Sequence, residues 1–252
     1  MDCKYIFLDI DGTLVDFQGK LADSALKALK TAKSNGHKLF VCTGRQRSQI
    51  YPWLLEKVDF DGAVCSSGAY VMADGECIAQ HCFSKEYITF LSDYFTAAHT
   101  PYCVQTEHTL MLEKWCGDAI VEHYLADGID RGKIDSLFGM TKIVESVPDT
   151  TLFRSSVVRY SFGSMGDRCG EVTDSRYTKA TGMAEILRRF DAPQSATIAF
   201  GDGDNDLEMM DFASFGVAMG NGTPALRAAA DMVTDDINSN GLYNAFKKLG
   251  LI

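Results

Sequence analysis

Two aspartates near the start of the chain, Asp9 and Asp11, are the first residues whose type and spacing suggest chemistry. They follow the apolar run at residues 5–8, flank Ile10 and stand just before Gly12. Two like charges at one place cost free energy unless a cation or a proton neutralises them. Because hard carboxylate oxygens suit magnesium best, the pair predicts a magnesium site. A strand end followed by an Asp-Gly turn is the alternative interpretation.

A second acidic cluster, residues 201–206, follows the apolar run at 196–200 and holds three aspartates, two glycines and an asparagine. Taken alone, Asp202 is most often a turn residue and Asp206 a helix cap. The whole cluster after a buried strand instead favours a metal site. With the first pair of aspartates it supplies oxygen ligands for one ion, and waters complete the shell as magnesium prefers.

Residues suited to phosphate binding follow a third apolar run, at 38–42. Thr43 and Gly44 offer a hydroxyl and a backbone N–H where we expect a helix to begin, and helix starts bind phosphate. Lys179 opens a later predicted helix. A lysine in a first helical turn is usually solvated, so its role depends on its neighbours.

The elements that must position these residues alternate between strand and helix. Four apolar runs read as strands buried on both faces of a parallel sheet: 5–8, 38–42, 62–65 and 196–200. Right-handed βαβ crossovers place the ends of such strands at one edge. Ligands of open α/β sheets bind at that edge, so the polar clusters are expected to meet there.

A stretch in the middle of the chain breaks this pattern. Alternating runs around 102–104, 109–112 and 157–162 predict an antiparallel sheet in a separate α+β domain. Residues 167–175 are polar and contain glycine, which predicts a linker. We therefore expect a catalytic core of residues 1–82 and 176–252 and an inserted cap of residues 83–175.

Four polar residues of this insert could touch a substrate: His108, Glu113, Arg154 and Arg159. Strand faces alternate towards solvent, so each fits an ordinary surface or sheet position better. We assign none of them to the site.

Composition restricts the class of protein. The chain has 252 residues, of which 46% are hydrophobic and 23% charged, as in folded proteins with a proper core. Its net charge of −10 argues against nucleic acid or an anionic membrane surface, which need a clustered positive field. No apolar run reaches the roughly 18–20 residues of a membrane span, and no signal-peptide pattern is present.

The eight cysteines have no C-x-x-C spacing, which argues against a zinc site. In a chain of this size a disulfide framework is not expected either. We expect reduced thiols and a cytoplasmic protein.

Four stretches, taken together, resemble the motifs of the haloacid dehalogenase (HAD) superfamily of phosphotransferases. Residues 9–14 resemble its first motif, 43–45 its second, Lys179 its third and 201–206 its fourth. The order and spacing fit the superfamily over essentially the whole chain. The sequence departs from the family pattern at Ser67-Gly68, where relatives usually have Asn-Gly, and at Ala180, where they often have glycine.

Motif spacing selects a subgroup. Asp11 and Thr43 are 32 positions apart (43 − 11), which leaves no room for an inserted cap. Arg45 and Lys179 are 134 positions apart (179 − 45), which leaves room for a strand, a helix and an insert of roughly 90 residues. This arrangement resembles the Cof-like subgroup with a type IIB cap, as in sugar phosphatases and phosphomannomutase.

The resemblance implies a fold and a reaction. The fold would be a Rossmann-like parallel-sheet core (HAD-like) with a smaller α+β cap domain inserted between the second and third motifs. The protein would be a Mg²⁺-dependent phosphatase that hydrolyses small phosphorylated metabolites, sugar phosphates first, through an aspartyl-phosphate intermediate. Its partner is then the metabolite, with no nucleic acid and no membrane, and its oligomeric state stays open.

The resemblance also implies residue roles. Asp9 would be the nucleophile and Asp11 the general acid and base. Asp9, the main-chain carbonyl of Asp11, and Asp202 would bind Mg²⁺. The remaining assignments are phosphate contacts from Thr43, Gly44, Lys179 and Asn205, and a supporting role for Asp206, which would orient Lys179 or the metal shell.

Two other functions fit the same motifs. A phosphomutase of the phosphomannomutase type would return the phosphoryl group to a sugar instead of to water. A non-catalytic phosphosugar-binding regulator would need neither a nucleophile nor a proton-transfer group, so the Asp9/Asp11 pair argues against it.

Overall fold

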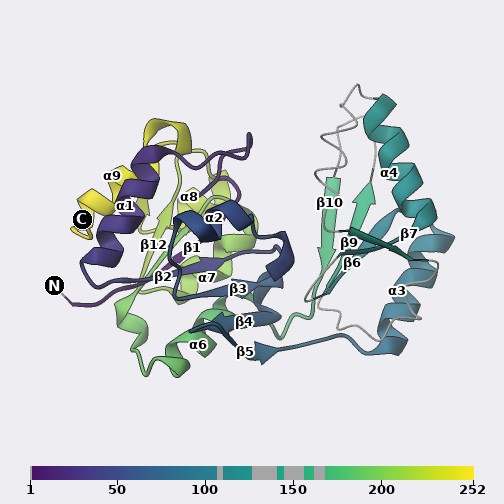
Figure 1. Cartoon of the computed structure of the whole chain (residues 1–252), viewed down its shortest axis with the longest axis horizontal. Helices are drawn as coiled ribbons and strands as arrows, with labels where there is room; N and C mark the ends of the chain where they lie inside the picture. The colour runs from purple at the N-terminus through teal and green to yellow at the C-terminus, as the bar shows by residue number, and fades with distance from the viewer. Residues whose placement is uncertain (1, 107–109, 127–140, 145–155, 162–167) are drawn as a thin grey trace. The chain divides into compact units, whose positions relative to one another are not determined.

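The computed structural model describes the chain except for residues 1, 107–109, 127–140, 145–155 and 162–167 (Figure 1). The chain divides into two compact units. The first comprises Met1–Arg45, Ile50–Gln80 and Arg176–Ile252, and the second comprises Gln46–Gln49 and His81–Ser175. The boundaries expected from the sequence, at 82/83 and 175/176, stay a prediction.

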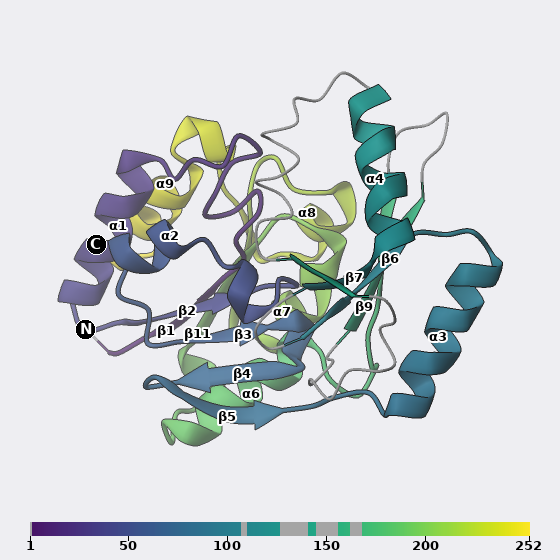
Figure 2. The ribbon, with the colours of Figure 1, turned by 45° about the vertical axis from the view of Figure 1, so that its right-hand side comes forward.

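The first unit is built on an eight-stranded sheet in the order β13-β12-β11-β1-β2-β3-β4-β5, whose central strands lie side by side in Figure 2. Six strands pair in parallel: β1 (Tyr5–Leu8), β2 (Lys38–Cys42), β3 (Gly62–Cys65), β11 (Thr197–Gly201), β12 (Phe215–Ala218) and β13 (Met232–Val233). Two more strands extend the sheet beyond β3 and pair antiparallel: β4 (Tyr70–Ala73) and β5 (Glu76–Gln80). The ends of β1, β2 and β11, where the polar motifs begin, therefore meet at one edge.

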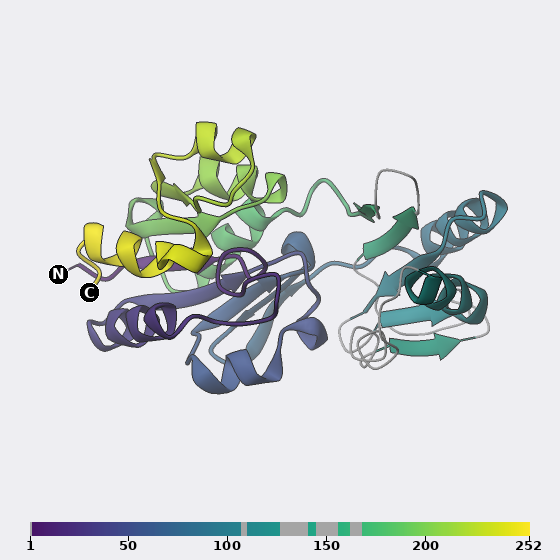
Figure 3. The ribbon, with the colours of Figure 1, turned by 90° about the horizontal axis from the view of Figure 1, so that it is seen from above.

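Helices cover both faces of this sheet (Figure 3). One face is covered by α1 (Asp23–Ser34), α2 (Pro52–Lys57) and α9 (Gly241–Lys248). The other is covered by α6 (Lys179–Arg189), α7 (Leu207–Phe212) and α8 (Pro224–Ala229). Leu8 packs into the first layer and Phe7 into the second, so the central strand is apolar on both sides. This confirms the predicted Rossmann-like core.

The second unit has a five-stranded sheet in the order β10-β9-β6-β7-β8. Its elements are α3 (Lys85–Ala97), β6 (Tyr102–Gln105), β7 (Leu110–Glu113), α4 (Lys114–Ala126), β8 (Thr141–Val144), β9 (Ser156–Ser161) and β10 (Arg168–Val172). All pairs are antiparallel except β7 with β8. The α+β character predicted for the insert is confirmed.

Strand β10 corrects one prediction, because residues 167–175 were expected to be a linker. Arg168 to Val172 instead pair with β9 in an antiparallel ladder. β10 lies at the edge of the sheet, and an edge strand can be polar because one of its sides meets solvent.

Glu113 serves the interior of the second unit. Its carboxylate accepts hydrogen bonds from the Tyr102 hydroxyl and the Trp115 indole N–H, both at 2.9 Å. Its carboxylate is therefore engaged within the second unit, and Glu113 is the last residue of β7, a sheet position of the kind that the sequence analysis favoured. His108, Arg154 and the side chain of Arg159 lie outside the described residues.

Two predictions about the class of protein, on membrane spans and on cysteines, can be compared with the structure. None of the described helices is long and apolar enough to cross a membrane. Seven of the cysteines are described, and all seven are free thiols.

Candidate active site

The first motif forms a tight turn directly after β1. Asp9 is 6% exposed, and its backbone N–H donates to the carbonyl of Phe200 in β11. The N–H groups of Leu14 and Val15 both donate to the carbonyl of Ile10, which closes the turn. The motif is thus anchored to the neighbouring strand.

Gly12 lets this turn approach the fourth motif. Its φ is +84°, a conformation that other residues rarely adopt, and a Cβ there would lie 2.1 Å from Oδ2 of Asp202. Beside it, the hydroxyl of Thr13 donates to Oδ1 of Asp202 at 3.2 Å. The two acidic motifs therefore pack directly against each other.

Lys179 lies inside this group of carboxylates. It opens α6, whose N-cap Thr178 accepts a hydrogen bond from the Thr181 N–H. Its side chain is only 1% exposed, and Nζ donates to Oδ1 of Asp9 at 2.7 Å and to Oδ1 of Asp206. A buried ammonium needs such partners, because moving an unpaired charge from water into the protein interior would cost several kcal/mol. Lys179 is therefore no ordinary solvated helix-start lysine.

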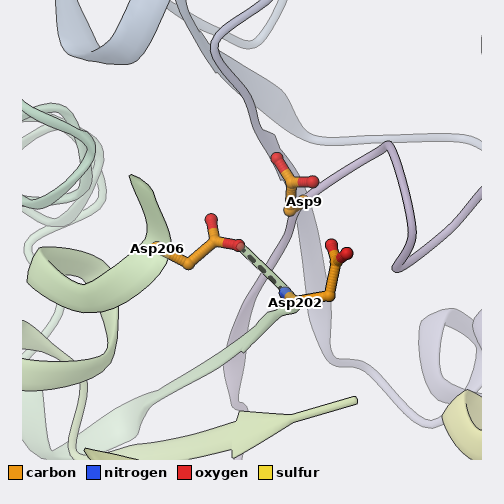
Figure 4. A group of neighbouring side chains, drawn as sticks. All are labelled: Asp9, Asp202 and Asp206. Carbon is orange, nitrogen blue, oxygen red and sulfur yellow. Dashed lines mark hydrogen bonds between the residues drawn. The ribbon is translucent and has the colours of Figure 1, made fainter. Parts of the chain in front are cut away.

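Asp206 fixes both Lys179 and the loop after β11. Its Oδ2 accepts the backbone N–H groups of Asp202 and Gly203, each at 3.0 Å, and the first of these bonds is drawn in Figure 4. Asp206 is fully buried. The neighbouring Asp204 instead accepts a hydrogen bond from the Thr223 hydroxyl, in keeping with a structural role.

The acidic group at this edge has a donor set that suits a divalent cation. Carboxylate oxygens of Asp9, Asp202 and Asp206 lie within 4.8 Å of one another, and Figure 4 shows the three side chains together. Both oxygens of Asp206 have hydrogen-bond partners. Within the described part of the chain, Oδ2 of Asp9 and Oδ2 of Asp202 accept no hydrogen bond. These two hard oxygens fit a magnesium ion.

Electrostatics agree with that fit. Burial raises the pKa of Asp9 to about 7; Lys179 opposes this shift and Asp206 adds to it. Burial, with Asp206 again adding, raises the pKa of Asp202 to about 6. Burial alone would lower the pKa of Lys179, but the attraction of Asp9 and Asp206 raises it. Two carboxylates that resist ionisation beside each other are stabilised by a bound cation.

Asp11 lies outside this acidic group and pairs with Arg45. Nε of Arg45 donates to Oδ2 of Asp11 at 2.6 Å, and Nη2 donates to Oδ1 at 2.8 Å. The Asp11 side chain is thus committed elsewhere, and metal binding by its main-chain carbonyl stays a prediction. The sequence analysis assigned Arg45 no role, although its place after β2, next to β1, was a usable signal.

The helix start expected at Thr43 and Gly44 is wrong. β2 is followed by a bend and a 3-10 turn at Arg47–Gln49, and α2 begins only at Pro52. Proline fits the first helical turn, where its missing N–H costs nothing, so it sets the helix start there. The Thr43 hydroxyl accepts the Arg45 N–H at 3.1 Å. Phosphate contacts from Thr43 and Gly44 stay predictions.

Two further residues complete the inventory. Asn205 is exposed in the 3-10 turn Asp204–Asp206, and its phosphate contact also stays a prediction. Asn221 was missed by the sequence analysis. Its Nδ2 donates to the carbonyl of Gly12 at 2.8 Å, and its Oδ1 accepts the Ile237 N–H at 2.9 Å. Its position after β12, at the same sheet edge, was the available signal.

Comparison with known proteins agrees with this geometry. A family model described as haloacid dehalogenase-like hydrolase matches residues 6–246. YkrA of Bacillus subtilis (strain 168) is 27% identical over 263 residues, covering 100% of both chains. The 5-amino-6-(5-phospho-D-ribitylamino)uracil phosphatase YitU of the same organism is 26% identical over 270 residues, covering 96% of each.

A solved structure extends the likeness to the cap. The HAD subclass IIB sugar phosphatase BT4131 matches with a TM-score of 0.80 at 25% identity, covering 99% of this chain and 100% of that one. The resemblance that the four motifs carry is thereby confirmed. The chain belongs to the haloacid dehalogenase-like hydrolase family and is a phosphatase of its subclass IIB.

Proposed function

We propose that this phosphatase hydrolyses phosphate monoesters of small metabolites, sugar phosphates first, in a Mg²⁺-dependent reaction through an aspartyl-phosphate on Asp9. The observation that carries the proposal is the nucleophile's geometry. One oxygen of Asp9 is held by Lys179 at 2.7 Å, and the other accepts no hydrogen bond from the described residues, while carboxylate oxygens of Asp202 and Asp206 lie within 4.8 Å of a carboxylate oxygen of Asp9. The names of two relatives, a sugar phosphatase and a phosphatase of a phosphoribityl compound, support the substrate class.

The first step forms one bond and breaks one. An oxygen of Asp9 attacks phosphorus in line, and the bond from phosphorus to the leaving oxygen breaks. Protonated Asp11 gives its proton to that oxygen, so an alcohol leaves. Lys179 offsets part of the charge on the transferring group, with Thr43, Gly44 and Asn205 as the proposed contacts to its other oxygens.

The second step restores the enzyme. Asp11, now a carboxylate, takes a proton from water as the water oxygen attacks phosphorus, and the bond to Asp9 breaks. Phosphate leaves, and Asp11 is again protonated. A magnesium ion held by Asp9, Asp202 and the Asp11 carbonyl would offset the repulsion between carboxylate and phosphate.

The inserted cap, proposed as residues 83–175, selects the leaving group and excludes water during the first step. We also propose that the enzyme works in the cytoplasm, where its thiols stay reduced.

The test is release of inorganic phosphate from a panel of sugar phosphates, nucleotides and pyridoxal phosphate, with magnesium or with EDTA. We expect release that EDTA abolishes and that ranks sugar phosphates first. The control is Asp9→Asn, which should release none. No release from any compound, or full release by Asp9→Asn, contradicts the proposal. Isomerisation of a hexose phosphate without release would identify a mutase instead.

A further inference from the structure

We propose that Arg45 is the positioning residue of Asp11. Its guanidinium holds the Asp11 carboxylate that activates water in the second step, and it keeps one bond to the same side chain when Asp11, as a carboxylic acid, gives its proton to the leaving group in the first step. This inference rests on the proposed function. It assigns a role to a residue that touches neither phosphate nor metal in that scheme and acts only through Asp11.

The pairing geometry fixes the orientation of the carboxylate as well as its position. Nε and Nη2 of Arg45 each donate to a different oxygen of Asp11, at 2.6 and 2.8 Å. Two parallel hydrogen bonds define the plane of the carboxylate, whereas a single bond would let it rotate. A lysine is a point charge and cannot make this fork, so Arg45 cannot be replaced conservatively.

Arg45 is itself held from behind by an aromatic pair. Nη2 of Arg45 also donates to the Tyr51 hydroxyl at 2.9 Å, and the guanidinium carbon lies 4.6 Å from the centre of the Tyr51 ring. Tyr51 stacks on Trp53, with ring centres 5.4 Å apart. Because Tyr51 is the N-cap residue of α2, the guanidinium is tied to a helix of the core.

The backbones at Arg45 and at Asp11 are held by contacts that do not involve the ion pair. The Arg45 N–H donates to the Thr43 hydroxyl at 3.1 Å, and the Arg45 carbonyl accepts the Ser66 N–H at 2.8 Å. Asp11 forms a bridge with Val15 in the turn of the first motif. The ion pair therefore adds control of the Asp11 side chain and is not needed to shape either loop.

Stability gives a weaker reason for this pair. The side chains of Arg45 and Asp11 are 28% and 43% exposed, and ion pairs open to solvent contribute about 0–1 kcal/mol. The position of this pair at the carboxyl ends of the strands is better explained if Arg45 orients Asp11 for proton transfer.

The proposed role predicts a dependence on the leaving group. An alkoxide leaving from a sugar phosphate needs the proton that Asp11 supplies, whereas p-nitrophenolate leaves without one. Loss of Arg45 should therefore slow the first step for a sugar phosphate and spare it for p-nitrophenyl phosphate. The second step needs Asp11 as a base for both substrates, so it should slow equally.

The experiment compares wild type with Arg45→Met and Arg45→Lys on both substrates at saturating magnesium. For Arg45→Met we expect kcat/KM for the sugar phosphate to fall about 100-fold, within the range of general acid catalysis, and to fall less than about 3-fold for p-nitrophenyl phosphate. We also expect a burst of p-nitrophenol equal to the enzyme concentration, because the phosphoenzyme accumulates. Added guanidinium should restore part of the lost rate for Arg45→Met.

Arg45→Lys and Tyr51→Phe serve as graded variants. Arg45→Lys keeps the charge without the fork. It should also lose more kcat/KM for the sugar phosphate than for p-nitrophenyl phosphate, but by a smaller factor than Arg45→Met. Tyr51→Phe removes only the hydroxyl behind Arg45 and should change the ratio of the two kcat/KM values in the same direction. It also carries the test if Arg45→Met does not fold, as judged by thermal unfolding.

Equal losses on the two substrates, with no burst and no rescue, would overturn the role of Arg45. Wild-type enzyme that releases phosphate together with that result would leave the proposed function intact. A wild type without activity, or an active Asp9→Asn, would instead reject the proposed function itself.

Discussion

Nζ of Lys179 donates a 2.7 Å hydrogen bond to Oδ1 of Asp9, although the two residues lie 170 positions apart in the chain. The sheet makes this contact possible, since β1 ends at the same edge as β11, and α6, which packs on one face of the sheet, begins at Lys179. The contact places a cation beside the proposed nucleophile and away from solvent.

Removing the lysine should leave two buried carboxylates without their shared cation. Lys179→Met is expected to abolish phosphate release and to lower the free energy of unfolding by about 3–5 kcal/mol. The measurement is urea unfolding. Lys85→Met is the matched control, since Lys85 also opens a helix but is exposed, and it should change stability by less than about 0.5 kcal/mol. Similar stability for both variants would contradict the structural part of this account.

Magnesium binding should depend on pH. With raised pKa values of about 7 for Asp9 and about 6 for Asp202, protons compete with the ion below neutral pH. We expect Mg²⁺ to raise the unfolding temperature at pH 8 and to raise it much less at pH 5.5. Asp202→Asn should lose the effect, whereas Asp204→Asn, which changes an exposed partner of Thr223, should keep it.

The direction in which the stability of the metal-free protein changes with pH follows from the same two pKa shifts. Both pKa values lie above the ordinary 3.8, so the folded protein binds more protons than the unfolded chain between about pH 4 and 7. Stability without metal should therefore fall as pH rises through that window, and saturating Mg²⁺ should reduce the fall. A metal effect of equal size at both pH values would contradict this assignment.

Substitutions at Gly12 and Gly19 can distinguish the cost of backbone strain from the cost of blocking a close contact with Asp202. Gly12 has a φ of +84° and no room for a Cβ beside Asp202, whereas Gly19 has a φ of +79° and nothing within 4 Å. Gly19→Ala should cost about 1 kcal/mol of stability and leave phosphate release unchanged. Gly12→Ala should cost more and abolish both phosphate release and stabilisation by Mg²⁺. Full activity of Gly12→Ala would show that the two motifs need not touch.

Local patterns predicted the frame of the molecule well. Strands such as β1 and β11 are apolar on both faces because helices cover both sides of the sheet, and that pattern can be seen without coordinates. The meeting of Asp9 and Asp202 at one edge then follows from the handedness of βαβ crossovers. The fold class and the acidic group could therefore be predicted.

Other features depend on pairings between distant loops. The fork from Arg45 to Asp11 and the bond from Asn221 to Gly12 join segments that the strand order brings to one edge of the sheet, but no periodicity reveals which side chains pair there. The expected helix at Thr43 failed because Pro52 sets the start of α2. β10 was missed because an edge strand can be as polar as a linker.

The covalent intermediate on Asp9 is the central claim, and trapping it is the most direct measurement. Asp11→Asn lacks the base of the second step, so it should hold the phosphoryl group after reaction with p-nitrophenyl phosphate and magnesium. Mass spectrometry of acid-quenched, digested protein should then find phosphate on the peptide that contains Asp9, and none when Asp9→Asn is added to the same variant. Phosphate release by the wild type, without phosphate on Asp9 in the trapped variant and with Asp9→Asn still active, would contradict the account.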